Sequence, residues 1–78
     1  MDNKQLRKCF AGRLMYALGI RDKTTTGFAK MVNLDPKSLY NYYSGTFPKL
    51  QTFYNLCEAL NVSADWLLGR TDKMEVNR

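Results

Sequence analysis

Histidine is absent from this sequence of 78 residues, and cysteine and proline each occur only twice. Without histidine, neither a Ser-His nor a Cys-His catalytic pair can form, and the commonest metal ligand is missing. Cys9 and Cys57 are far apart and form no Cys-x-x-Cys motif, so a zinc site with the usual ligand spacing is excluded. The acidic residues are scattered, and no glycine-rich phosphate loop is present. The sequence therefore indicates a protein that is not an enzyme and that needs no cofactor or metal.

Long apolar runs are also missing, so no segment is expected to cross a bilayer, and the N-terminus has no signal-peptide pattern. We therefore expect a cytoplasmic protein with no membrane partner and no evident small-molecule substrate. In that compartment both thiols stay reduced; a disulfide or a redox switch is the alternative. The length predicts one domain.

The charge is unbalanced toward the basic side. The chain carries 12 Lys and Arg against 7 Asp and Glu, which gives a net charge of +5 and a pI of about 9.4. A basic small domain often binds a polyanion, and nucleic acid is the commonest one. Many proteins are mildly basic, however, so this signal gains weight only beside a suitable helical arrangement.

Apolar periodicity predicts five helices and no strand, which makes the expected fold class all-α. Residues 4–18 repeat apolar side chains at steps of three and four, and Gly19 is expected to end that helix. A second strong apolar stripe covers residues 49–60. Ser63 is expected to cap a short last helix, which Gly69 stops.

Two short helices in the middle of the chain carry the functional prediction. They are expected over residues 25–32 and 36–44, with a tight turn between them. Asn33 in this turn tolerates the left-handed backbone that ends a helix. Asp35 is a strong N-cap, and Pro36 suits the first helical position because its missing N–H costs nothing there.

The second of these helices has two unlike faces. Leu39 and Tyr42 are expected to pack inward, which turns Lys37, Tyr40 and Asn41 outward. Asparagine can pair bidentately with adenine, and lysine can donate to guanine. A short helix with these side chains, braced by another helix across a tight turn, is suited to the major groove of DNA.

The cations of the first helix have two interpretations. Lys4, Arg7, Lys8 and Arg13 lie largely off the apolar face and are typical of a solvated helix surface. The alternative is that one or two of them contact a phosphate beside the binding site, and Arg13 is the better candidate.

The order of these segments resembles the lambda-repressor-like helix-turn-helix domains of phage repressors, Cro-type proteins and small bacterial regulators. The resemblance covers residues 10–69. Each piece is common, whereas the set in this order is specific. The matching pieces are Thr24, Phe28-Ala29, Asn33-Leu34-Asp35, Leu39, Tyr42, Ser44-Gly45, Pro48, Leu50 to Phe53, and Val62-Ser63-Ala64-Asp65-Trp66-Leu67-Leu68-Gly69.

The resemblance implies a DNA-binding domain over residues 1–69, followed by a polar tail at 70–78. It implies a transcriptional repressor in a bacterial or phage-infected cell, whose third helix reads double-stranded DNA and whose homodimer binds a palindromic operator. The positions expected to contact bases are Pro36, Lys37, Ser38 and Asn41, to which the outward-facing Tyr40 is added. The positions expected to contact phosphates are Thr25, Thr26, Thr46, Phe47 and Lys49, to which Arg13 is added.

Several positions depart from the family pattern. Thr25 stands where a phosphate-binding Gln is common, and Asn33 replaces the usual turn Gly. Pro36 cannot donate a hydrogen bond to a base. Tyr43 replaces a frequent Glu and belongs to a tyrosine-rich run that the family does not usually have.

Some alternatives are open at this point. Ser38 either reads a base or braces the helix start; Tyr40 either reads a base or shelters apolar neighbours; Phe47 is either a lid on the core or a contact to sugar. The tail is either disordered or paired with a second subunit, and the dimer surface is helix five, the tail or helix one. The alternative function is an antitoxin-like or accessory protein-interaction module, which need not bind DNA in a salt-dependent way.

Overall fold

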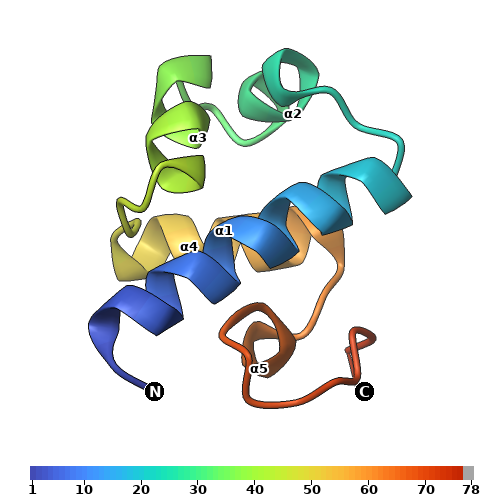
Figure 1. Cartoon of the computed structure of the whole chain (residues 1–78). Coiled ribbons are helices and arrows are strands. Elements are labelled where there is room, and N and C mark those ends of the chain that lie inside the picture. Colours follow the sequence, from blue (N-terminus) through green and yellow to red (C-terminus); the bar gives the residue numbers. More distant parts are fainter. Residues whose placement is uncertain (77–78) are drawn as a thin grey trace.

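Five helices and no strand form the regular structure of residues 1–76, the part of the chain that this computed structural model describes. The predicted all-α class is confirmed. In Figure 1, α1 and α4 cross the centre of the molecule, α2 and α3 lie on one side of them, and α5 lies on the other. The helices are α1 (Asn3–Ile20), α2 (Thr25–Met31), α3 (Pro36–Tyr43), α4 (Leu50–Leu60) and α5 (Ala64–Leu67).

An aromatic cluster at the centre of the core fixes α3 against α1 and α4. The ring of Phe10 on α1 lies 4.7 Å from Phe47, 5.9 Å from Phe53 and 6.2 Å from Tyr42, measured between centroids. Every helix adds buried apolar side chains to this core. Full burial of each large apolar side chain contributes about 1.5–3 kcal/mol, so packing determines the position of α3.

The first helix is longer than the sequence pattern predicts. Asp2 and Gln5 form a reciprocal capping box, which starts the helix at Asn3. The expectation that Gly19 ends the helix is wrong, because α1 continues to Ile20. The left-handed residue comes later, at Asp22, whose φ is 60°.

The turn between α2 and α3 has the predicted geometry. Asn33 adopts a left-handed backbone with φ of 60°, and the N–H of Leu34 donates to the carbonyl of Ala29 at 2.8 Å. Thr24 caps α2 by accepting from the N–H of Gly27. A Cβ on Gly27 would lie 2.9 Å from that capping hydroxyl, which explains why glycine stands inside this helix.

The segment after α5 returns along the body of the protein. Gly69 turns the chain with φ of 81°, and the carbonyl of Met74 accepts from the N–H of Ser63 at 2.9 Å. The side chain of Met74 packs against the core. Residues 70–76 are therefore attached to the body of the protein, whereas Asn77 and Arg78 of the predicted tail lie outside the described residues.

Arg21 joins the end of α1 to the end of α4. Its Nε donates to the carbonyl of Leu60 at 2.9 Å, and its guanidinium also reaches the carbonyl of Asn61 at 3.3 Å. A cation is favourable there because the last carbonyls of a helix carry partial negative charge.

Among residues 1–76, no helix is long and apolar enough to cross a membrane.

Candidate nucleic-acid interface

The third helix is anchored by one face and open on the other. Leu39 is fully buried and Tyr42 nearly so, while the Asp35 side chain caps the helix by accepting from the N–H of Lys37 at 2.9 Å. Lys37 and Asn41 are exposed. Anchoring by packing and capping holds their backbone positions fixed relative to the core.

Lys37 and Asn41 lie one turn apart, which places them on the same side of α3. Within residues 1–76, neither side chain forms a hydrogen bond or an ion pair. An ammonium group and an amide are therefore free to recognise another molecule. Their donors and acceptors suit guanine and adenine edges respectively.

The other predicted base-contacting residues flank this pair. Pro36 occupies the first turn of α3, as expected, and is half-buried together with Ser38. Tyr40 is more open, with 56% of its surface exposed, and its ring packs edge-on against Tyr43 at 5.8 Å. The structure thus brings all five residues to the first two turns of one helix.

Tyr43 forms a link to α2 that the sequence pattern did not reveal. Its hydroxyl lies 3.0 Å from the hydroxyl of Thr25. Burial raises the pKa of Tyr43 above its ordinary value, and the hydrogen bond with Thr25 offsets part of this rise. The phenol is therefore neutral at physiological pH and braces the two helices. The sequence offered one hint of this inward contact, because Tyr43 directly follows Tyr42, which was predicted to face the core.

The predicted phosphate-contacting residues fall into two groups. At the start of α2, Thr26 is exposed, whereas the hydroxyl of Thr25 is engaged with Tyr43. After α3, Gly45 takes a φ of 114°, and Thr46 and Lys49 are exposed beyond it. The first group precedes α3 in the sequence and the second follows it, and the contact of Thr25 with Tyr43 brings the start of α2 to the C-terminal part of α3.

Phe47 belongs to the core rather than to the exposed loop. Its ring lies 4.7 Å from Phe10 and 6.0 Å from Phe53. Of the two interpretations of Phe47, the structure supports the lid on the core. Because the ring packs into the core, only the backbone of this residue is left to approach a phosphate.

Arg13 lies away from α2 and α3 and holds the segment after α5. One guanidinium nitrogen donates to the carbonyls of Trp66, at 2.5 Å, and Thr71, at 2.7 Å. The guanidinium also lies over the Trp66 ring, 5.0 Å from its centroid, and 3.4 Å from a carboxylate oxygen of Asp72. We therefore leave Arg13 out of the candidate interface.

Replacing Arg13 with methionine should lower the free energy of unfolding by about 1–2 kcal/mol, because hydrogen bonds from a charged donor are lost while the freed carbonyls partly regain water. Thermal denaturation measures this change. Arg7→Met, which removes an unpaired guanidinium from the same helix, should stay within about 0.5 kcal/mol. A loss of affinity for DNA by Arg13→Met without any change in stability would restore the phosphate-contact interpretation.

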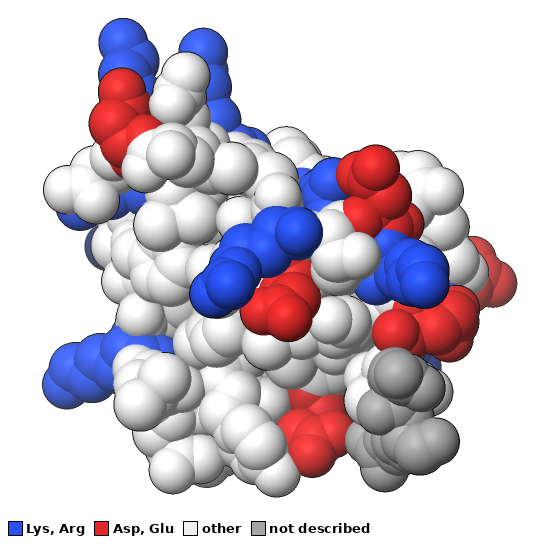
Figure 2. All heavy atoms as spheres, turned by 90° about the horizontal axis from the view of Figure 1, so that it is seen from below, with Lys and Arg blue, Asp and Glu red and all other residues white. Residues whose placement is uncertain are grey.

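Charge is distributed unevenly along the chain. Residues 1–57 hold nine of the twelve Lys and Arg but only three of the seven Asp and Glu. Figure 2, seen from the α5 side, shows cationic and acidic side chains lying beside one another. Ion pairs on this side join Arg13 to Asp72, Arg21 to Glu75, and Arg70 to Asp65. The uncompensated positive charge therefore lies elsewhere.

The described residues offer few other reactive or metal-binding groups. Cys9 and Cys57 are both free thiols, and burial raises the pKa of Cys57 to about 11. Among the described residues, no group of three or more Cys, Asp or Glu side chains is placed to hold a metal ion.

Comparison with known proteins found no match. No family model matches the chain, and no curated protein or solved structure matches it either.

Proposed function

We propose that the chain is a sequence-specific DNA-binding protein of the lambda-repressor-like helix-turn-helix type. In this proposal α2 and α3 are the helix-turn-helix pair, and α3 enters the major groove of double-stranded DNA. The observation that carries it is the pair Lys37 and Asn41, exposed and unpaired on a helix whose opposite face is fixed in the core. Two base-reading groups on a rigid support are what direct readout needs.

The charge distribution supports the same proposal. Lys30, Lys37 and Lys49 accompany a single acidic residue, Asp35, across residues 25–49. That carboxylate is occupied as the cap of α3. A positive field around the helix pair attracts the phosphate backbone before any base is read.

The regulatory role follows from DNA occupancy. A small domain that binds an operator blocks the access of other proteins to it, so we propose a repressor. We propose further that two copies bind a palindromic site, because a two-fold symmetric operator matches the symmetry of a homodimer.

Selection from a random duplex library, followed by titration of the enriched duplex at two salt concentrations, tests the function. We expect a palindromic consensus and an affinity that falls steeply as salt is raised. A scrambled duplex of equal length is the control. If no sequence is enriched and binding stays weak at both salt concentrations, the DNA proposal is wrong.

The second candidate function is a protein-interaction module, and the exposed Tyr40 favours it. An aromatic ring that is 56% exposed beside a second tyrosine can anchor a protein partner. Binding of this kind lacks the linear dependence of log affinity on log salt that counterion release from DNA produces.

A further inference from the structure

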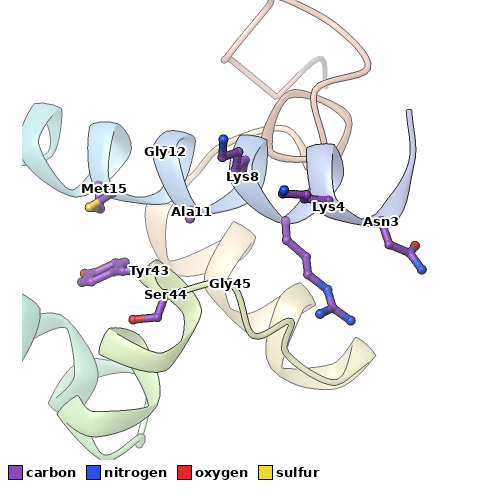
Figure 3. Close-up of a pocket in the computed structure, with 10 residues that line it drawn as sticks. Asn3, Lys4, Lys8, Ala11, Gly12, Met15, Tyr43, Ser44 and Gly45 are labelled. Atoms are coloured by element: carbon purple, nitrogen blue, oxygen red, sulfur yellow. The ribbon is translucent and has the colours of Figure 1, made fainter.

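A groove runs between the N-terminal half of α1 and the C-terminal end of α3. Its volume is about 770 Å³, and α1 contributes Lys4, Arg7 and Lys8 to its lining. Ser44 and Gly45 line the opposite wall, where the chain leaves α3. Figure 3 shows this arrangement, with Lys4 and Lys8 on α1 and Ser44 and Gly45 on the chain that faces it. We refer to this feature as the α1–α3 groove.

The three cations of the groove have no anionic partner within the protein. Within residues 1–76, Lys4, Arg7 and Lys8 form no ion pair and no side-chain hydrogen bond. No acidic residue lines the groove. This contrasts with Arg13, Arg21 and Arg70, which all pair with carboxylates on the α5 side.

The position of these cations opposes the stability of α1. They occupy the first two turns, where three cations face a single acidic side chain, the N-cap Asp2, whose carboxylate is already engaged by the N–H of Gln5. Cations near a helix N-terminus are repelled by the positive end of the helix dipole, and like charges three and four residues apart repel one another. A local arrangement that costs stability without a compensating contact is typical of a binding site.

The shape of the cluster favours a chain of phosphates over a single anion. Lys4 and Lys8 are four residues apart, which corresponds to about 6 Å along the helix axis. One strand of duplex DNA presents a phosphate for about every 3.4 Å of its axis. A row of cations of this length can therefore follow consecutive phosphates of one strand.

The groove also continues the candidate interface. Its far wall, Ser44 and Gly45, directly precedes Thr46, the first of the predicted phosphate-contacting residues after α3. We propose that the α1–α3 groove binds the sugar–phosphate backbone of duplex DNA that flanks the base pairs read by α3. This inference rests on the proposed function and extends the DNA contact beyond α2 and α3.

Two charge-matched double variants of the full chain test the inference. Arg7→Gln/Lys8→Gln removes one arginine and one lysine from the groove, and Arg70→Gln/Lys73→Gln removes the same two charges from the segment after α5. Both are titrated with the selected duplex at several salt concentrations. We expect the groove variant to bind about tenfold more weakly at low salt and to lose about two, for each bound copy of the chain, from the slope of log affinity against log salt. The control should keep the wild-type slope.

The length of the duplex provides a second measurement. Wild type should bind a duplex extended by about half a helical turn at each end more tightly than the minimal duplex, whereas Arg7→Gln/Lys8→Gln should not distinguish them. The base preference of this variant should be unchanged, since the groove contacts only backbone. Its Tm should equal or exceed that of wild type, because cations have been removed from the start of α1.

The outcomes separate this inference from the proposed function. If wild type binds the selected duplex and both double variants behave alike, the groove inference is overturned while the proposed function stands. If wild type binds no duplex, both are overturned. If Arg7→Gln/Lys8→Gln instead loses affinity for polyglutamate and keeps its affinity for DNA, the groove binds an acidic protein partner and the inference is wrong.

Discussion

Replacing Gly69 with alanine is expected to lower the free energy of unfolding by about 2–4 kcal/mol. Gly69 has a φ of 81°, where an L side chain is strained, and an added Cβ would lie 2.6 Å from the Sγ of Cys9. A domain of this length has a total stability of roughly 4–12 kcal/mol. The Tm measured by circular dichroism should therefore fall by roughly 10–25 °C.

Two comparisons identify the origin of that loss. Gly12 and Gly19 lie within α1, and a Cβ at either position would meet nothing within 4 Å. Alanine there should stabilise the protein by up to about 1 kcal/mol. In the double variant Cys9→Ala/Gly69→Ala the contact with sulfur is absent, so the backbone strain and the looser contact with the Met1 side chain should remain. A Tm for Gly69→Ala equal to that of wild type would contradict this explanation.

Replacing Lys37 with alanine is expected to weaken binding of the selected operator by about 1–3 kcal/mol, or roughly 5- to 150-fold. The reason is that its ammonium group is exposed, unpaired and placed on the open face of α3. Because it is proposed to read a base, Lys37→Ala should lose discrimination at one base pair in each half-site of the operator and keep it at the others. Titration of wild type and variant against single-base-pair operator variants measures this.

Lys49→Ala and Lys73→Ala are the matched controls, since each removes one positive charge. Lys49 lies beyond the end of α3, so its loss should weaken binding to every sequence and reduce the salt slope by about one for each bound copy of the chain. Lys73 lies in the segment after α5 and should have no effect. Equal losses of Lys37→Ala on operator and random DNA would exclude base reading by this residue.

Most of the fold could be predicted from the sequence, because local signals and apolar periodicity agree. Asp35, Ser63 and Asn33 each have the capping or turn role that their side chains predict. The end of α1 was predicted wrongly, because the helix continues through the exposed residues Gly19 and Ile20, and the N–H of Arg21 still donates to the carbonyl of Ala17. The left-handed residue is instead Asp22, three positions further along the chain.

For residues of the candidate site, the sequence could predict exposure only where it follows from the periodicity of the residue's own helix. Lys37 and Asn41 follow from the periodicity of α3, and both are exposed as expected. The contacts of Arg13 could not be inferred, because its partners Trp66 and Thr71 are more than fifty residues away in the sequence. The link between Thr25 and Tyr43 joins two helices across 18 residues, so the periodicity of either helix cannot detect it.

The contacts of Arg13 can form only late in synthesis. The hydrogen bonds to Trp66 and Thr71 span 53 and 58 residues, so a nascent chain that lacks residue 71 cannot form both of them. Closing such long loops costs more chain entropy than forming the local turn between α2 and α3. The contacts of Arg13 therefore form after the turn between α2 and α3 can already be in place.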